Sequence, residues 1–183
     1  LHLLHTIYKN NANVTVRALL VDEGIRGYRD KGIQHTEAFC AERGVPLTIV
    51  SYKEAFGFPL DDVVQGRKPC SVCGVLRRSL LNTKAKELGA TKLATGHNLD
   101  DEAQTILMNQ FRRNTDASAR LGPISGSGDH EGFVRRIKPL YLMTEKEVMT
   151  YAYLHGLVRE FNECPYNKES YRNQVREMLN RFE

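Results

Sequence analysis

Three of the four cysteines are spaced so that their thiolates could share one metal centre. Cys70 and Cys73 form a C-x-x-C pair after Pro69, and Cys164 lies far downstream in the sequence Glu163-Cys164-Pro165-Tyr166. Thiolates three residues apart at the start of a helix can bind one metal together, and the helix N-terminus favours the thiolate form. Three ligands leave one position open in a tetrahedral site or a four-iron cluster. The pattern predicts an open metal site, with a structural zinc or a redox dithiol as alternatives.

The fourth cysteine, Cys40, is expected to have a different role. It stands seven residues after Ile33, and therefore on the same face of a predicted helix. A free cysteine on the apolar face of a helix behaves as a small hydrophobic residue. We therefore expect Cys40 in the core and not among the metal ligands.

A second group of polar residues runs from Gly96 to Glu102 and reads Gly-His-Asn-Leu-Asp-Asp-Glu. It follows a predicted strand and opens a predicted helix, at the edge of the sheet where α/β folds bind nucleotides. Gly96 allows a ligand to approach the backbone, and the free N–H groups of the helix start favour phosphate. The carboxylates could hold Mg²⁺ against a triphosphate or could simply complement the helix dipole, and composition favours neither. His97 is expected to support the site by hydrogen bonding.

A third candidate is the end of the run Leu19-Leu20-Val21, where the chain turns at Asp22-Glu23-Gly24. A strand end followed by a loop in this class of fold commonly presents main-chain groups to an adenine ring. Val21 is therefore a candidate for a nucleotide site.

The elements that would position these residues alternate between strands and helices. The expected strands are 14–21, 47–52 and 92–95, and the expected helices are 1–10, 30–43, 71–88, 100–113, 145–155 and 169–183. We therefore expect one α/β domain over residues 1–183, with a three-layer arrangement of helices around a parallel sheet. A segment rich in Gly and Ser, about 114–132, is the expected mobile loop, and about 145–183 is expected to be a helical part. No capping residue precedes the first helix, so the sequence is expected to be truncated at its N-terminus.

Composition and charge suggest a soluble protein with an anionic partner. The chain has 183 residues, of which 41% are hydrophobic and 26% charged, and its net charge is +4. It shows neither an apolar run of about 20 residues nor the arrangement of a secretory signal, so we expect a cytoplasmic protein without membrane association. Three arginine pairs, at 77–78, 112–113 and 135–136, could contact phosphates, although solvated surface charge explains them equally well.

Together these stretches resemble the PP-loop ATP pyrophosphatase superfamily, and within it the TtuA/TtcA/NcsA-type tRNA 2-thiolation enzymes. The matching residues follow the family's order along the chain: Val21-Asp22-Glu23-Gly24-Ile25-Arg26, Pro69-Cys70-Ser71-Val72-Cys73-Gly74, Ala94-Thr95-Gly96-His97-Asn98-Leu99-Asp100-Asp101, Lys138-Pro139-Leu140, Glu163-Cys164-Pro165-Tyr166 and Tyr171-Arg172. The resemblance implies an adenine nucleotide alpha-hydrolase-like fold. The family's signature, Ser-Gly-Gly-x-Asp-Ser, is absent and is expected just before Leu1.

The resemblance also implies a reaction and its site. ATP would adenylate the C2 oxygen of a tRNA pyrimidine, with uridine the expected base, and sulfur would then replace that oxygen. The implied [4Fe-4S] ligands are Cys70, Cys73 and Cys164, the implied catalytic residue is Asp101, and the implied site for ATP and Mg²⁺ contains Val21, Gly96 and His97. The implied partners are tRNA and a sulfur donor, which is a ubiquitin-like thiocarboxylate carrier, a persulfide or sulfide, and the implied assembly is a homodimer.

One residue helps to choose within the family, and two other functions remain open. Arg77 stands four residues after Cys73, where some TtuA-type enzymes carry a catalytic lysine, and an arginine cannot shuttle a proton. This favours the NcsA-like branch, which acts on the wobble uridine. A ligase of the tRNA-lysidine synthetase type would also adenylate a tRNA base but would not need three cysteines. A zinc-stabilised RNA-binding module without catalysis would leave the segment from Gly96 to Asp101 without a role.

Overall fold

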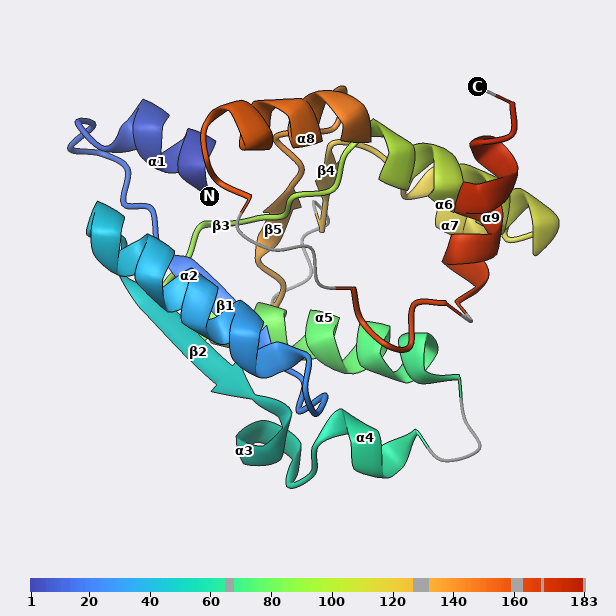
Figure 1. Ribbon diagram of the computed structural model, residues 1–183, viewed down its shortest axis with the longest axis horizontal. Coiled ribbons are helices and arrows are strands. Elements are labelled where there is room, and N and C mark those ends of the chain that lie inside the picture. The colour runs from blue at the N-terminus through green and yellow to red at the C-terminus, as the bar shows by residue number, and fades with distance from the viewer. Residues whose placement is uncertain (65–67, 127–131, 159–162, 169, 183) are drawn as a thin grey trace. The chain divides into compact units, whose positions relative to one another are not determined.

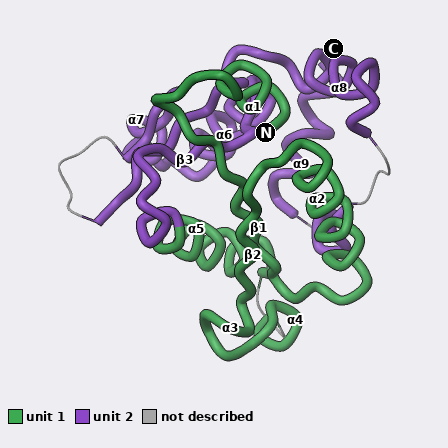
Figure 2. The backbone as a smooth tube through the Cα atoms, turned by 90° about the vertical axis from the view of Figure 1, so that its left-hand side faces the viewer, with its two compact units in different colours: residues 1–84 green, residues 85–183 purple. Residues whose placement is uncertain are grey.

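A computed structural model describes residues 1–64, 68–126, 132–158, 163–168 and 170–182 (Figure 1). The chain forms two compact units, residues Leu1–Lys84 and Ala85–Glu183 (Figure 2). Helix α5, Pro69–Glu87, begins in the first unit and ends in the second. Each unit has its own small sheet and its own helices.

The first unit is built on two parallel strands. Strand β1, Ala18–Asp22, pairs with β2, Leu47–Ser51, so that Ala18 lies opposite Leu47 and Asp22 lies opposite Ser51. Helix α2, Arg29–Arg43, connects the two strands and lies along the sheet (Figure 1). It ends at Gly44, whose φ of 63° lies in the left-handed region that glycine tolerates. The predicted β-α-β unit is therefore present.

Cys40 lies in the core of this unit, as its spacing predicts. It is 2% exposed and belongs to a buried cluster with Ala18 of β1 and Val45. Phe39 and Leu47 pack against this cluster. The cluster joins α2 to the sheet, so Cys40 serves the packing of the first unit.

Two short helices occur where the sequence analysis expected no helix. They are α3, Tyr52–Phe56, and α4, Leu60–Val63; helix α1, His2–Tyr8, was expected. Helix α3 begins with a capping box, in which Ser51 Oγ accepts from Glu54 N at 3.1 Å and the Glu54 carboxylate accepts from Ser51 N. The Ser-x-x-Glu pattern was present in the sequence and could have located this helix start.

The second unit contains a three-stranded sheet that is only partly parallel. Strand β3, Lys92–Ala94, is parallel to β5, Arg135–Ile137, but β4, Ile124–Ser125, is antiparallel to β5. The prediction of a wholly parallel sheet is therefore wrong here. The connection over 126–134 is shorter than the dozen or so residues that a parallel crossover needs, so β4 and β5 can pair only as a hairpin.

Four helices are described in the second unit: α6, Leu99–Phe111, α7, Thr115–Ala119, α8, Glu145–Leu154, and α9, Tyr171–Leu179. Helices α6 and α9 pack against each other. Helix α7 and strand β4 lie inside the predicted mobile loop and give part of it regular secondary structure, while 127–131 lie outside the described chain. The mobility of the segment stays a prediction. Asn114 starts α7 by accepting from Ala117 N at 3.0 Å. The predicted C-terminal helices are present as α8 and α9.

In the described parts of both units, no helix combines the length and the apolar character that crossing a bilayer requires.

The turn after β1 requires a glycine at position 24. Two glycine-to-alanine substitutions test this requirement. Gly24 and Gly27 have nearly equal φ values of 71° and 70°, but a Cβ on Gly24 would lie 2.5 Å from Pro59 Cβ, whereas one on Gly27 would meet nothing within 4 Å. Gly27→Ala should therefore lose only the conformational term, about 1–2 kcal/mol. Gly24→Ala should lose about 1–3 kcal/mol more through the clash. Urea unfolding of both variants measures the difference, and equal losses would contradict the close packing of this turn.

Candidate functional site

The loop after β1 is held in one conformation by hydrogen bonds from both sides. Gly24 N donates to Asp22 Oδ1 at 2.8 Å, and Leu60 N, at the start of α4, donates to Glu23 O at 2.8 Å. Val21 is buried at the end of β1, so only its main-chain oxygen is a candidate to bind a ligand. The predicted adenine loop is thus a rigid feature of the first unit.

The Val21 carbonyl already has a partner in this structure. Arg29 donates to it from Nε at 2.9 Å and also from Nη2. A carbonyl oxygen has two lone pairs, so an adenine amino group would share this acceptor with Arg29 or displace it. Arg29 also forms an ion pair with Glu23, with Nε 2.8 Å from Oε2. Sequence reasoning missed Arg29, because no local pattern ties it to the end of β1.

Cys70 and Cys73 lie in the first turn of α5, as their spacing predicts. Cys73 is buried, and Arg77 Nη2 donates to its Sγ at 3.3 Å. The buried Tyr52 hydroxyl donates to Cys73 O at 2.9 Å and lies 3.7 Å from Cys73 Sγ. Cys70 is exposed. Two thiols one helical turn apart, one exposed and one facing a cation, fit a shared metal centre that requires thiolates.

The pKa values of groups at this cysteine pair depend on burial and on neighbouring charges. Burial raises the pKa of the Cys70 thiol, the negative charge of Cys73 raises it further, and Arg77 opposes both. Burial, followed by the proximity of Cys73, raises the pKa of Tyr52 far above its usual range, so its hydroxyl keeps its proton. Burial alone would lower the pKa of Arg77, but Cys73 and Glu23 more than offset this effect and the pKa is raised. Arg77 is therefore a permanent cation beside the cysteine pair.

Asp101 occupies the third position of α6, where it closes a capping box. Asp101 N donates to Asn98 Oδ1 at 3.0 Å, and Asp101 Oδ2 accepts from Asn98 N at 3.1 Å. Its other oxygen, Oδ1, lies 3.3 Å from Arg172 Nη1 of α9. The carboxylate is thus fixed by its own helix on one side and by an arginine 71 residues away on the other.

Arg172 binds several groups on α6 at once. Nη1 also lies 3.2 Å from Asp101 O and 3.2 Å from Gln104 Oε1, and Nη2 donates to Thr105 Oγ1 at 3.0 Å. The guanidinium thereby joins α9 to the first turns of α6. In the sequence analysis Arg172 was part of the family resemblance only, because no local pattern pairs it with Asp101.

The acidic run at the start of α6 is engaged by the protein itself. Asp100 Oδ2 accepts from Glu145 N, the first residue of α8, at 2.6 Å. Glu102 is buried and paired with Lys138. All three carboxylates therefore have partners in this unit, and as placed they fit the structural interpretation better than a Mg²⁺ site. Binding of Mg²⁺ by this run stays a prediction, and it would require one of these contacts to break.

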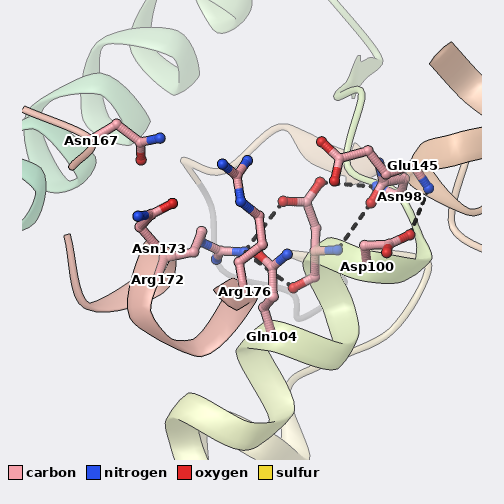
Figure 3. A pocket seen from close by; sticks show the side chains of 9 residues that line it. Asn98, Asp100, Gln104, Glu145, Asn167, Arg172, Asn173 and Arg176 are labelled. Carbon is pink, nitrogen blue, oxygen red and sulfur yellow. Dashed lines mark hydrogen bonds and ion pairs between the residues drawn. The ribbon is translucent and has the colours of Figure 1, made fainter. Parts of the chain in front are cut away.

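A polar cavity of about 100 Å³ lies beside Asp101, among the first turns of α6, α8 and α9 (Figure 3). It is lined by amides and charged groups, namely Asn98, Asp100, Asp101, Gln104, Glu145, Asn167, Arg172, Asn173 and Arg176. Two of these residues, Arg172 and Asp101, form an ion pair, with Nη1 3.3 Å from Oδ1. Because most of its charges are already paired, the cavity suits a polar ligand that is close to neutral.

Cys164 belongs to the same unit as this cavity and lies close in sequence to one of its lining residues. Asn167 N donates to Cys164 O at 2.8 Å, which closes a turn, and Asn167 lines the cavity. Arg176 of α9 pairs with Glu163 at 3.6 Å. Helix α9 therefore contacts both Asp101, through Arg172, and the residue before Cys164, through Arg176, one helical turn further on.

Gly96 and His97 lie between β3 and α6. A Cβ on Gly96 would meet nothing within 4 Å, so the described protein does not itself require a glycine there, and space remains for a ligand near the backbone. His97 Nδ1 lies 2.9 Å from Thr95 Oγ1. Burial lowers the pKa of His97, Lys138 and Arg172 lower it too, and Asp101 acts in the opposite direction.

The predicted site residues fall in both units. Cys70, Cys73 and Val21 lie in the first, and Cys164, Gly96, His97 and Asp101 lie in the second. Among the described residues, no three His, Cys, Asp or Glu side chains are gathered so that they could hold a metal ion. The three-cysteine centre and the ATP site therefore stay predictions.

The sequence profile of the PP-loop domain family matches residues 1–182. The chain belongs to this family. Its α/β architecture agrees with the fold of this family. The prediction of a PP-loop α/β fold is thus confirmed, apart from the antiparallel pairing of β4.

Curated PP-loop relatives include two kinds of tRNA-modifying protein. The chain is 39% identical over 193 residues to the tRNA 2-thiolation protein NcsA of Haloferax volcanii, covering 100% of this chain and 60% of that protein. It is 38% identical over 168 residues to the tRNA-5-methyluridine(54) 2-sulfurtransferase of Pyrococcus horikoshii, covering 92% and 54%. The chain thus spans little more than half the length of these relatives.

A solved structure is also similar over nearly the whole chain. It is described as the U34-tRNA thiolase NcsA from Methanococcus maripaludis with its [4Fe-4S] cluster. The two are 40% identical with a TM-score of 0.87, over 99% of this chain and 59% of that one.

The surroundings of His97 predict its titration. Its pKa should lie below the ordinary value of about 6.5, because burial and the nearby cations disfavour the imidazolium. Asp101→Asn should lower it further, and Arg172→Gln should raise it. Since the unfolded chain binds the proton more readily, the contribution of His97 to stability is present above about pH 6.5 and is lost as pH falls. NMR titration, with His97→Asn to assign the resonance, measures these shifts; shifts of the opposite sign would refute this arrangement of charges.

Proposed function

We propose that this chain is the catalytic PP-loop domain of an ATP-dependent tRNA thiolase. The observation that carries the proposal is the match to a U34-tRNA thiolase, with a TM-score of 0.87 and 40% identity over 99% of the chain. The enzyme uses ATP to adenylate the C2 carbonyl oxygen of a tRNA pyrimidine and replaces that oxygen with sulfur, releasing AMP and pyrophosphate. Because the chain spans only part of its relatives, this activity is proposed for the complete protein.

Cys70, Cys73 and Cys164 are the proposed ligands of a [4Fe-4S] cluster. The C-x-x-C pair at the start of α5 and the cation beside Cys73 support this assignment. When bound, a cluster with three protein ligands supplies an iron that can hold the sulfur to be transferred. The role of the protein residues is to hold the thiolates in place and to keep Arg77 beside them as a counter-charge.

Asp101 is the proposed catalytic residue. Its carboxylate is held at the start of α6 and faces the polar cavity, where a pyrimidine base could lie. A carboxylate that accepts a hydrogen bond from N3–H of the base increases the electron density on O2. That oxygen can then attack the α-phosphorus of ATP, and pyrophosphate leaves. A carbonyl oxygen is a poor leaving group until it carries AMP, so this activation has to precede the entry of sulfur.

The proposed ATP site contains the carbonyl of Val21 and the backbone of Gly96, with His97 beside it. The open space at Gly96 and the strand end at Val21 support it. Mg²⁺ is the proposed counter-ion of the nucleotide phosphates.

The proposed partners are tRNA and a sulfur donor, which is a thiocarboxylate carrier, a persulfide or sulfide, and the proposed assembly is a cytoplasmic homodimer. Names such as the cytoplasmic tRNA 2-thiolation protein 1 of Mus musculus, at 38% identity, support the location and the substrate. Relatives from both branches have nearly the same identity, so Arg77 is the feature that favours the wobble uridine. Arg77 contacts Cys73 and Glu23, which supports a role as a permanent cation and not as a proton shuttle.

The first experiment is metal analysis of the complete protein, purified and reconstituted without oxygen. About four irons and four sulfides per chain are expected, together with ATP-dependent thiolation of tRNA. Zinc without sulfide would favour the RNA-binding module instead. Adenylation that survives loss of the cysteines would favour a ligase of the lysidine synthetase type.

Substitution of the third cysteine tests the ligand set. Cys164→Ser should abolish both the cluster and thiolation while leaving far-ultraviolet circular dichroism unchanged, because Cys164 lies in a turn outside the core. Cys40→Ala is the matched control: it should lower stability but keep the iron content, since Cys40 belongs to the core of the first unit. A Cys164→Ser protein that retains four irons would contradict the ligand assignment.

Substitution of Asp101 separates catalysis from cluster binding. Asp101→Asn should keep the iron content and lower the rate of product formation by about 10²–10⁴-fold, the range for loss of a group that assists proton transfer. Asp116→Asn, at the first turn of α7, changes another helix-start aspartate and should leave the rate unchanged. Normal turnover by Asp101→Asn would reduce Asp101 to a helix-capping residue.

A further inference from the structure

A continuous line of contacts connects the predicted adenine loop with a predicted cluster ligand inside the first unit. Arg29 donates to Val21 O and pairs with Glu23 Oε2 at 2.8 Å. The other oxygen of Glu23, Oε1, lies 3.6 Å from Arg77 Nε. Arg77 Nη2 then donates to Cys73 Sγ at 3.3 Å. The main-chain oxygen at the end of β1 and the thiol at the start of α5 are thus separated by only three side chains.

Glu23 is the middle of this line and is 3% exposed. A carboxylate that is buried to this degree needs cationic partners. If its ion pair with one arginine weakens, its ion pair with the other arginine must therefore become stronger. Arg29 is well covered, whereas about half of the Arg77 side chain is exposed. Arg77 is therefore the partner that can move. It has two neighbours that can carry negative charge: it donates to Cys73 Sγ and forms an ion pair with Glu23.

We propose that Glu23 and Arg77 are positioning residues that couple occupancy of the adenine site to the cluster ligand Cys73. The inference rests on the proposed function, because it takes Val21 O as the acceptor for adenine and Cys73 as a ligand. Neither Glu23 nor Arg77 touches the reacting atoms in this scheme, and each acts through the groups that it holds.

The direction of the coupling follows from competition for shared partners. Negative charge gathered at three thiolates draws Arg77 toward Cys73 and away from Glu23. Glu23 then attracts Arg29 more strongly, which weakens the hold of Arg29 on Val21 O. The adenine amino group meets less competition for that oxygen, so the cluster should tighten nucleotide binding. By linkage, the nucleotide should stabilise the cluster by the same factor.

The test measures the dissociation constant of α,β-methylene-ATP for the complete protein with and without its cluster, by calorimetry. The wild-type protein should bind the analogue about fivefold or more tightly when the cluster is present, the lower end of typical coupling between sites. In Arg77→Gln the two constants should become nearly equal. The electron paramagnetic resonance spectrum of the reduced cluster should change on addition of the analogue in the wild type and not in this variant.

Arg26→Gln is the matched control. It removes an arginine from the same loop whose ion pair with Asp62, at 3.7 Å, is exposed and has no connection to Cys73, so the fivefold ratio should remain. Glu23→Gln breaks the line at its centre and should also abolish the ratio. If either variant fails to fold, the other still tests the proposal.

Two results would overturn the inference: equal constants in the wild-type protein, or an unchanged ratio in Arg77→Gln. Iron content and thiolation of the wild-type protein report separately on the proposed function. A protein that holds its cluster and thiolates tRNA without any coupling would disprove only the role of Glu23 and Arg77.

Discussion

The need to neutralise buried carboxylates organises both units. Glu23 in the first unit and Glu102 in the second are almost completely buried, and each is paired with cations from other elements: Arg29 and Arg77 in one case, Lys138 in the other. An unpaired charge at such depth would cost several kcal/mol. These pairs therefore hold the end of β1 against the start of α5, and the start of α6 against the end of β5, and those are the positions of the candidate site residues.

In the second unit, capped helix N-termini also hold side chains of the candidate site in place. Helices α6 and α8 begin with reciprocal capping boxes, and the Asp100 side chain also accepts from the first residue of α8. Three helix starts therefore surround the polar cavity, with α9 attached to α6 through Arg172 (Figure 3). Side chains anchored to helix starts lose little freedom on binding a ligand, which is what a site that positions a nucleotide base against a carboxylate requires.

Several arginines that the sequence offers as phosphate contacts have structural tasks instead. Arg77 is shared between Cys73 and Glu23, and Arg112 lies over the ring of Tyr171, 4.4 Å from its centre. Arg172, which entered the sequence analysis through the family resemblance, likewise holds α9 to α6. The Arg77 guanidinium already interacts with a carboxylate and a thiol, so it offers less free charge to a phosphate than its place in an arginine pair suggests.

The sequence by itself determined the local features: the helices and strands with clear periodicity, the glycine that ends α2, the core position of Cys40 and the C-x-x-C pair at a helix start. Each depends on residues within one or two turns, where spacing dictates geometry. Only the tertiary structure decided which charges meet. The pairing of Asp101 with Arg172 spans 71 residues, and Glu23 meets Arg77 from a helix that begins 46 positions after it in the chain. No local pattern encodes such contacts, because they follow from how strands and helices pack.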